Sequence, residues 1–370
     1  MTSLTATGSI ITTLATMALV FLMQVALPPA PSLPGPAAVH TLEQTLPELM
    51  RKYCVPGMSL TLIRDGSIYW VKSFGVKDGK VPVTKDTTFE AASLSKVVFA
   101  YAVLKLVDQG KIDLDAPLQH YLDTPYIPGD TRINKITARM VLSHRTGLPN
   151  WRPKEGLTIH FDPGDHFSYS GEGFVFLAKA VERITDKSLN DFMQQMVFTP
   201  LGMTSSSYVW RQEYEARTAI GHDKDGRAQD KWKPKEANPA SSLQTTALDY
   251  ARFMTTLLDG KGLKPNTLKQ METPQTAVEQ NCTANCFDVA PLSTSVFWGL
   301  GVGLEKTSAG QAFWHWGDNG AFKAYMVGFP EHKSGLVMFT NSENGLSIAD
   351  AAVKAALGSD QPSLQWLNHR

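Results

Sequence analysis

The chain has 370 residues, of which 43% are hydrophobic and 19% are charged, proportions that are ordinary for a soluble globular protein. Lysine plus arginine and aspartate plus glutamate each count 35, so the formal net charge is +0. This balance, without a dense basic stretch that has aromatic residues interleaved, excludes nucleic acid as a partner. The length is sufficient for a large core and for two domains.

The first forty residues differ from the rest of the chain. Ser9 to Leu27 is apolar or small apart from Gln24, and a proline-rich stretch follows it, with Pro28, Pro29, Pro31, Pro34 and Pro36. An apolar run with such a spacer is typical of an export signal or a single membrane anchor. No Lys or Arg precedes Arg51, so charge does not fix its orientation. A buried core helix is the alternative, which the spacer disfavours. We expect an exported protein (periplasmic or secreted), or one anchored to the membrane through residues 9–27.

The pattern of residues from Thr41 to Gly110 predicts a helix, a hairpin and a second helix. Thr41 to Tyr53 can form an amphipathic helix. Met58 to Arg64 and Ser67 to Phe74 are rich in β-forming residues, and Asp65-Gly66 between them is a strong hairpin signal. Ser93 to Gly110 is apolar nearly all round and ends in glycine, which predicts a buried helix.

The rest of the chain predicts more helices and then strands. Helical periodicity marks Phe174–Ile184, Leu189–Val197 and Leu243–Leu258, the last opened by Thr245 or Thr246. Three further strands and a last helix are predicted over Gln311–Trp316, Phe322–Phe329, Gly335–Thr340 and Leu346–Leu357.

Strands near both ends with helices between them predict an α+β fold. We expect one antiparallel sheet built from both chain ends and flanked by helices, with an inserted mainly helical lobe. The sheet lobe would comprise about residues 41–112 and 240–370, and the helical lobe about residues 113–239, after an N-terminal segment of residues 1–40. A catalytic cleft would then lie between the sheet and the helical lobe.

The three cysteines indicate no chemistry of their own. Cys282 and Cys286 lie beside Asn and Thr, which suits a surface loop and permits a small disulfide loop after export. Without nearby histidines the two thiols make a poor zinc site, so no metal is expected. Cys54 lies in an apolar context and is expected to be a buried thiol rather than a nucleophile.

The first candidate chemical group is Ser93-Leu94-Ser95-Lys96, at a predicted helix start. A lysine one turn after a serine places its amine on the same helix face as the hydroxyl. The amine can activate the hydroxyl if burial and nearby positive charge lower its pKa from about 10.4. The apolar helix supplies the burial, and its N-terminus supplies a positive dipole end. Alone the pattern is weak, because a helix-start serine with a solvated lysine explains it as well.

Tyr169 is the second candidate group. It begins Tyr169-Ser170-Gly171, in a loop just before the Phe174 helix. A phenol with a lysine beside it can pass a proton to a leaving group. Taken alone, the motif is better explained as an ordinary helix-entry tyrosine.

The third candidate group is His315-Trp316-Gly317, at the end of a strand and followed by Asp318. A glycine inside a strand allows close approach to the backbone. An amide just after it could complete an oxyanion hole with the amide of Ser93. A strand histidine at a turn is the alternative reading of this motif.

In this order, the three motifs together resemble the β-lactamase and penicillin-binding-protein superfamily, and in particular its class C-like members. The resemblance covers nearly everything from about Val55 to Asn341. Supporting phrases are V-P-G-M-S-L-T-L-I-R-D-G, G-K-I-D-L-D-A-P-L, and the segments Leu142–Pro149, Phe198–Met203 and Trp298–Gly303. The resemblance implies a serine hydrolase without a metal or an organic cofactor.

The resemblance also implies a role for each residue. Ser93 would be the acylated nucleophile, Lys96 the principal base, and Tyr169 a partner in proton transfer with the leaving group. The backbone amides of Ser93 and Asp318 would form the oxyanion hole. His315 stands where many relatives have lysine and would orient Tyr169 or the substrate carboxylate. Further residues of the substrate site would be Gly171, Trp316 and Gly317.

Two departures from the family pattern bear on the substrate. Gly171 replaces the asparagine whose amide binds the acylamido group of β-lactams, and is expected to leave space without a side-chain donor. His315 replaces lysine, which weakens the case for a dedicated β-lactamase. We therefore expect a carboxylesterase-type acyl hydrolase, acting on a small-molecule ester, amide or β-lactam.

Two alternatives stay open. One is a β-lactamase or a peptidase acting on D-amino-acid or cell-wall substrates. The other is a non-catalytic binding or structural relative, against which the intact Ser93, Lys96 and Tyr169 argue. The sequence does not decide the oligomeric state.

Overall fold

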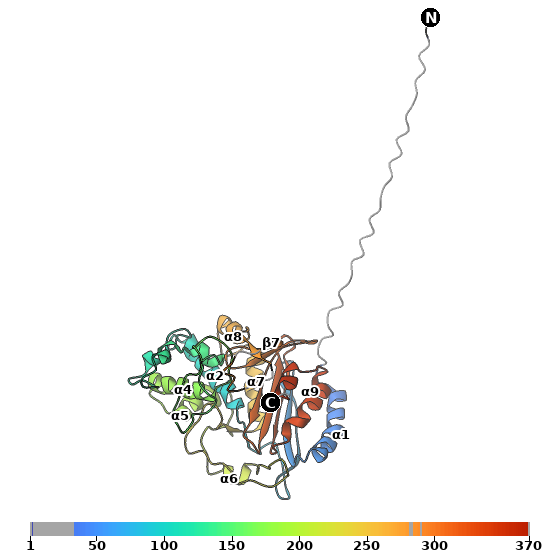
Figure 1. Cartoon of the computed structure of the whole chain (residues 1–370). Helices are drawn as coiled ribbons and strands as arrows, with labels where there is room; N and C mark the ends of the chain where they lie inside the picture. Colours follow the sequence, from blue (N-terminus) through green and yellow to red (C-terminus); the bar gives the residue numbers. More distant parts are fainter. Residues whose placement is uncertain (1, 3–32, 281–283, 289–290, 369–370) are drawn as a thin grey trace.

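The computed structural model of the chain describes residues 2, 33–280, 284–288 and 291–368. Its centre is a nine-stranded antiparallel sheet in the order β3-β2-β1-β11-β10-β9-β8-β7-β6 (Figure 1). The N-terminal strands of this sheet are β1 (Gly57–Arg64), β2 (Ser67–Asp78) and β3 (Val81–Pro82). The C-terminal strands are β6 (Thr276–Glu279), β7 (Leu292–Trp298), β8 (Gly303–Thr307), β9 (Gly310–Asp318), β10 (Lys323–Phe329) and β11 (Ser334–Thr340). Both chain ends therefore contribute to one sheet, which confirms the predicted α+β fold.

The two ends of the chain meet at β1, which pairs with β2 on one side and with β11 on the other. Leu60, for example, lies between Lys72 and Met338 in the register of the sheet. Asp65 and Gly66 form the predicted hairpin turn, with φ angles of 52° and 70°. Positive φ at both central residues gives a turn whose twist matches that of the strands.

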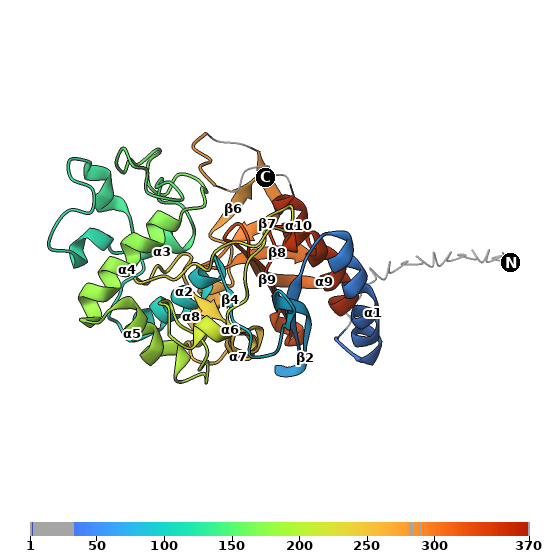
Figure 2. The same ribbon diagram turned by 90° about the horizontal axis from the view of Figure 1, so that it is seen from below.

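Helices cover both faces of the sheet, and strand side chains alternate between these faces. In β11, Leu336 and Met338 belong to one core cluster, whereas Val337 and Phe339 belong to the other. Burial on both faces explains why this strand is almost wholly apolar. One face is covered by α1 (Pro36–Lys52), α9 (Ala349–Leu357) and α10 (Pro362–Leu367). The other is covered by α2 (Leu94–Asp108), α7 (Ala247–Leu258) and α8 (Pro265–Met271) (Figure 2).

A helical lobe lies beside the sheet, between α2 and the chain that returns to α7 (Figure 2). From residue 113 to residue 239, all of them described, the chain forms short helices and loops with isolated bridges. The helices are η1 (Leu118–Tyr121), η2 (Thr131–Lys135), α3 (Ala138–Leu142), α4 (Gly171–Thr185), α5 (Leu189–Met193), η3 (Gln194–Phe198) and α6 (Tyr214–Arg217). A separate two-stranded sheet of β4 (Phe89–Glu90) and β5 (Gln244–Thr245) joins the start of α2 to the returning chain.

Several predicted elements have shifted ends. The first helix begins at Pro36 instead of Thr41, because proline is favourable at the first position of a helix. The helix expected from Leu243 begins at Ala247, because the two residues of β5 pair with β4 first. Thr246 then caps α7 by accepting a hydrogen bond from a backbone amide of the first turn. The helix expected over 346–357 is divided into η5 (Gly345–Ile348) and α9, and a further short turn, η4 (Pro330–His332), joins β10 to β11.

The cysteines only partly follow the prediction. Cys54 is exposed, so the expectation of a buried thiol is wrong. Its φ of 53° places it in the turn after α1, and the following residue, Val55, enters the core instead. Cys286 is disulfide-bonded, whereas Cys282 lies outside the described residues.

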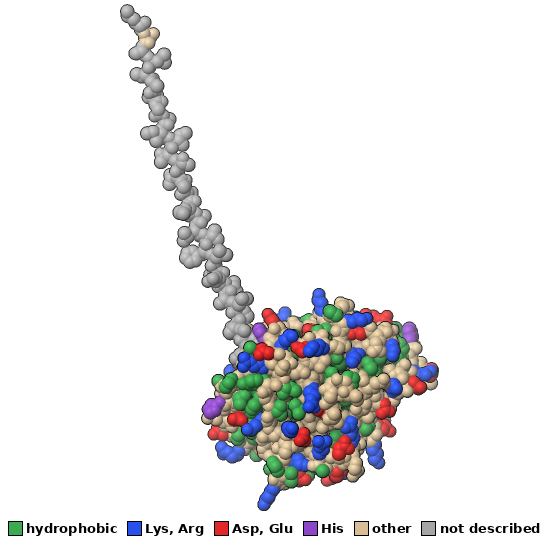
Figure 3. Space-filling view, turned by 180° about the vertical axis from the view of Figure 1, so that it is seen from behind, with side chains coloured by type: hydrophobic (Ala, Val, Ile, Leu, Met, Phe, Trp, Pro, Cys, Tyr) green, Lys and Arg blue, Asp and Glu red, His purple; other side chains and the backbone are tan. Residues whose placement is uncertain are grey.

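The predicted anchor, residues 9–27, also lies outside the described residues. Among those that the structure does describe, no helix combines the length and the apolar character needed to cross a membrane. On the face shown in Figure 3, basic and acidic side chains are interspersed, in keeping with their equal numbers in the sequence.

Candidate active site

Ser93 lies at the start of α2, in a turn that neighbouring segments hold in place. Ala92 just before it has a φ of 49°, a left-handed conformation that a non-glycine residue adopts only where its surroundings impose it. Leu243 holds this turn on both sides. Its carbonyl accepts from Ala91 N–H at 2.8 Å, and its own N–H donates to Ser95 Oγ at 3.1 Å. The position of the Ser93 hydroxyl is therefore set by the backbone around it.

Lys96 lies directly beside the hydroxyl. Its Nζ is 3.1 Å from Ser93 Oγ, and it donates to Ala240 O at 2.8 Å. The side chain is fully buried, as predicted, and this burial lowers the pKa of Lys96 well below its ordinary value of 10.5. A neutral amine in contact with a hydroxyl is placed to accept its proton.

Tyr169 reaches the same lysine from the helical lobe. Lys96 Nζ lies 4.8 Å from the centroid of the Tyr169 ring, which is almost completely buried. Ser170 begins α4 by accepting from Gly173 N–H at 3.0 Å, while its own hydroxyl donates to Pro149 O at 2.9 Å. The Ser170 hydroxyl therefore joins the predicted loop to the start of α4 and to the Pro149 segment.

His315, on β9, completes the group from the sheet. Its Nδ1 lies 2.7 Å from Trp316 O, so the neutral ring carries its proton on Nδ1 and presents Nε2 as an acceptor. Burial is the main cause that lowers the pKa of His315 to about 3, and positive charge on Lys96 would add to this effect. The ring is thus neutral at physiological pH, with its centroid 6.1 Å from that of Tyr169. Among the described residues, Nε2 has no hydrogen-bond partner.

Gly317 brings β9 against the start of α2. A Cβ at this position would lie 2.5 Å from Ala91 O, a distance that no side chain tolerates. In the turn that follows, the Asp318 carboxylate accepts from Lys323 Nζ at 2.6 Å. Gly317 therefore lies against Ala91 and Ala92, directly before Ser93, and the oxyanion hole formed by the amides of Ser93 and Asp318 stays a prediction.

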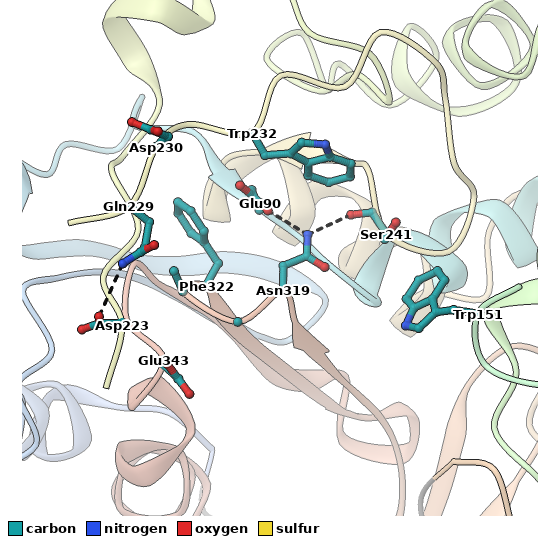
Figure 4. A pocket seen from close by; sticks show the side chains of 12 residues that line it. Glu90, Trp151, Asp223, Gln229, Asp230, Trp232, Ser241, Asn319, Phe322 and Glu343 are labelled. Atoms are coloured by element: carbon teal, nitrogen blue, oxygen red, sulfur yellow. Dashed lines mark hydrogen bonds between the residues drawn. The ribbon is translucent and has the colours of Figure 1, made fainter. Parts of the chain in front are cut away.

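A cavity of about 570 Å³ adjoins this group (Figure 4). Ser241 and Asn319 on its wall each follow a residue of the reaction centre, Ala240 and Asp318 respectively. Asn319 Nδ2 donates to Glu90 Oε2 at 2.8 Å and to Ser241 O at 3.3 Å, so the wall is braced by its own hydrogen bonds. In the described ranges, no group of three or more His, Cys, Asp or Glu side chains is placed to hold a metal ion.

Comparison with known proteins decides the family of the chain. The family model described as Beta-lactamase matches residues 42–358. The chain belongs to the beta-lactamase family. It is 26% identical over 333 residues to penicillin-binding protein 4 of Amycolatopsis lactamdurans, covering 84% of this chain and 87% of that protein. Protein flp of Staphylococcus aureus strain MRSA252 is 23% identical over 226 residues, which are 56% of this chain and only 44% of flp.

Solved structures agree with this family. The octameric penicillin-binding protein homologue from Pyrococcus abyssi has a TM-score of 0.70 at 23% identity, covering 85% of this chain and 76% of that one. D-alanine carboxypeptidase AmpC from Burkholderia cenocepacia has a TM-score of 0.69 at 22% identity, covering 86% and 97%. At these identities the two structures show the shared fold alone. The predicted superfamily is confirmed, and beta-lactamase family membership supports hydrolysis or acyl transfer at a serine.

Gly171, which the resemblance placed where asparagine was expected, does not leave the space that was expected. A Cβ there would lie 2.8 Å from Asn150 O and 3.1 Å from Trp151 Cζ3. The Gly171 N–H also lies 2.9 Å from Asn150 Oδ1, to which it donates. The segment of Asn150 and Trp151 therefore fills the place that the asparagine side chain would need.

Trp316 was expected to line the substrate site, but its ring lies in the aromatic core of the sheet. It is 4% exposed and packs against Tyr169, with 4.7 Å between the ring centroids. Trp314 and Trp366 pack on it from other sides. This position makes Trp316 a packing partner of Tyr169.

Two residues of the site were not predicted. The ring of His144 stacks on Tyr169 with centroids 4.2 Å apart, and its Nδ1 accepts from Ser170 N–H at 3.0 Å. Burial is the main cause that lowers the pKa of His144 well below 6.5, and positive charge on Lys96 or His315 would lower it further. Ala240 takes part only through its carbonyl. The sequence carries no signal for such a backbone contact, whereas His144 lies in the segment Leu142–Pro149, which resembles class C-like members but was assigned no role.

Proposed function

We propose that the chain hydrolyses carboxylic esters through an acyl-enzyme on Ser93. Lys96 would take the hydroxyl proton as Ser93 Oγ attacks the ester carbonyl, and the oxyanion would be stabilised by the amides of Ser93 and Asp318. Tyr169 would pass the proton to the leaving alcohol oxygen. A water deprotonated by the same groups would then attack the acyl-enzyme and release the carboxylic acid. The 3.1 Å contact between Lys96 Nζ and Ser93 Oγ carries this proposal.

The charges near the nucleophile favour an uncharged ester over a substrate with a carboxylate. Carboxylates are bound by cationic or strongly donating side chains. Burial lowers the pKa of Lys96 and of His315 and so favours their neutral forms, and Lys323 is already paired with Asp318 at 2.6 Å. In the described part of the site, these three side chains therefore offer no unpaired cation to a β-lactam or to the C-terminus of a D-peptide.

A direct comparison of two chromogenic substrates tests the ester preference. Wild type is expected to hydrolyse p-nitrophenyl butyrate with a kcat/KM about tenfold or more above that for nitrocefin, because the carboxylate of nitrocefin lacks a counter-charge, a mismatch worth about 1–3 kcal/mol. Both rates are measured spectrophotometrically, with Ser93→Ala as the control for spontaneous hydrolysis. A tenfold advantage for nitrocefin would overturn the ester assignment and favour a β-lactamase.

The second candidate is a peptidase that acts on D-amino-acid or cell-wall-like peptides. The names of two similar proteins favour it, since one is a penicillin-binding protein and the other a D-alanine carboxypeptidase. Incubation with a peptide ending in D-alanyl-D-alanine separates the two candidates. Release of D-alanine with a higher kcat/KM than release of p-nitrophenol would favour the peptidase.

A further inference from the structure

The cavity beside the reaction centre is the part of the site that the reaction itself does not explain. Trp151, on its wall, lies between the cavity and the lysine, with Lys96 Nζ 5.6 Å from the centroid of the indole ring. Asn319, near the middle of the cavity, follows Asp318, whose amide is proposed for the oxyanion hole (Figure 4). A group attached to the reacting carbonyl can therefore extend directly into this cavity.

Aromatic side chains form the apolar part of the wall. Trp151 and Trp232 are 48% and 42% exposed, although tryptophan is normally buried. Phe322 adds a third aromatic ring to the wall, on the side of Asn319 away from Trp151 (Figure 4). Exposed indole rings around a cavity provide apolar contact area and also electron-rich faces, which attract cations.

The charged part of the wall is acidic. Four carboxylates line the cavity, and none of the described residues that line it is Lys or Arg; the four are Glu90, Asp223, Asp230 and Glu343. Burial raises the pKa of Glu90 to about 7, so this carboxyl is partly protonated at neutral pH. The negative charge of the cavity therefore comes mainly from the other three.

Basic side chains near the cavity neutralise these carboxylates only in part. Asp223 lies 3.8 Å from Arg227 Nη1. Glu343 accepts a hydrogen bond from the Lys224 backbone N–H at 3.0 Å. Among the described residues neither Glu343 nor Asp230 forms an ion pair with Lys or Arg. Lys231, the neighbour of Asp230, directs its amine to Glu215 O instead, at 2.7 Å.

We infer that this cavity binds the acyl part of the substrate and that this acyl part carries a positively charged ammonium group. The inference rests on the proposed ester hydrolysis and adds the substrate class to it. An ammonium group would be attracted by Asp230 and Glu343 and would lie against the faces of the indole rings. An acyl chain with a carboxylate would be repelled by the same residues. A neutral chain would gain only apolar contact.

Three esters that share a three-carbon spacer and differ in the charge of the terminal group test the inference. They are the p-nitrophenyl esters of 4-(trimethylammonio)butyrate, of its uncharged isostere 5,5-dimethylhexanoate, and of glutarate as the anionic monoester. In each case Ser93 Oγ forms the acyl bond, p-nitrophenolate leaves, and water releases the acid. The cationic ester is expected to have a kcat/KM about tenfold or more above that of the neutral ester, with the anionic ester lowest.

Variants that remove carboxylates of the cavity then test whether these residues cause the preference for the cationic ester. The double variant Asp230→Asn, Glu343→Gln should lower the ratio of kcat/KM for the cationic ester to that for the neutral ester about tenfold. Glu331→Gln is the matched control, because Glu331 is an exposed carboxylate in η4, at the far end of β10 from the site. This control should keep the wild-type ratio. A double variant that also keeps it would overturn the inference.

The rates measured for the three esters distinguish failure of the inference from failure of the proposed function. If the neutral ester is hydrolysed as well as the cationic one, the ester hydrolase stands and the cationic acyl group is wrong. If none of the three is hydrolysed, the proposed function fails. Binding then tests the cavity separately, by calorimetric titration of Ser93→Ala with the methyl esters of the same three acids. Equal affinity for the cationic and neutral methyl esters would contradict a cation-binding cavity.

Discussion

Replacing Lys96 by methionine is expected to lower kcat/KM for p-nitrophenyl butyrate by about 10²–10⁴-fold, the usual contribution of a general base. Methionine has a similar length, carries no charge and suits the fully buried position. The variant should therefore fold normally while Ser93 loses the group that takes its proton. Stopped-flow or steady-state assays measure the loss, and circular dichroism checks the fold.

Lys105→Met provides a matched control on the same helix. Lys105 lies nine residues further along α2, about 14 Å along the helix axis, and its amine donates to Met196 O. Its replacement should leave turnover near the wild-type value. Near-normal turnover of Lys96→Met would instead show that another group activates Ser93.

The pH dependence of kcat/KM in the wild-type protein is a second test of Lys96 as the general base. Burial lowers the pKa of Lys96, so its neutral form is populated well below pH 10.5. Since only the neutral amine can accept a proton, kcat/KM should rise with pH as Lys96 loses its proton, and this rise should be absent from Lys96→Met.

Replacing Gly317 by alanine is expected to lower kcat by a comparably large factor, because the added methyl group would clash with its neighbours. The new Cβ would lie 2.5 Å from Ala91 O and 3.0 Å from Ala324 Cβ, so β9 would have to move away from the start of α2. This movement would displace the Asp318 amide from the developing oxyanion. The loss of one such donor lowers kcat by about 10²–10³-fold.

Gly35→Ala is the control for the substitution itself, because a Cβ at Gly35 would come no closer than 3.7 Å to any atom beyond its two chain neighbours. This variant should retain both its melting temperature and its activity. Gly317→Ala should lose activity even where circular dichroism shows that it is folded. Full activity of folded Gly317→Ala would mean that the strand does not contribute an oxyanion donor.

The parts of the structure that the sequence predicted are those with local signals. The spacing of Ser93 and Lys96 placed two groups on one helix turn, and Asp65-Gly66 marked the hairpin. β6, β7 and β8 were missed because they alternate weakly; the burial of β7, for example, changes along the strand from mostly exposed to mostly buried. Of these three strands only β6 lies at the edge of the sheet, and all three are specified by pairing with the strands next to them in the chain rather than by a periodic apolar pattern.

The parts of the site that were missed depend on contacts between distant segments. The Ala240 carbonyl reaches Lys96 across 144 residues of chain, and no side chain marks it. For Gly171 the sequence predicted free space that the structure does not contain. A glycine lacks the side-chain atoms of an asparagine, and the sequence does not reveal what fills the space that they would take. The structure shows that Asn150 and Trp151 fill it. The cavity lining likewise combines residues from both lobes.

The measurement that tests the central assignment most directly is the site of covalent labelling. An aryl alkylphosphonate should add once to wild type in an intact-mass spectrum, peptide mapping should locate the adduct on Ser93, and Ser93→Ala should remain unlabelled. Ser95 is fully buried and accepts from Leu243 N–H, so it should not react. Cys54 is the exposed thiol that could compete. An adduct on Cys54 or Ser95, or labelling of Ser93→Ala equal to that of wild type, would contradict the assignment of Ser93 as the nucleophile.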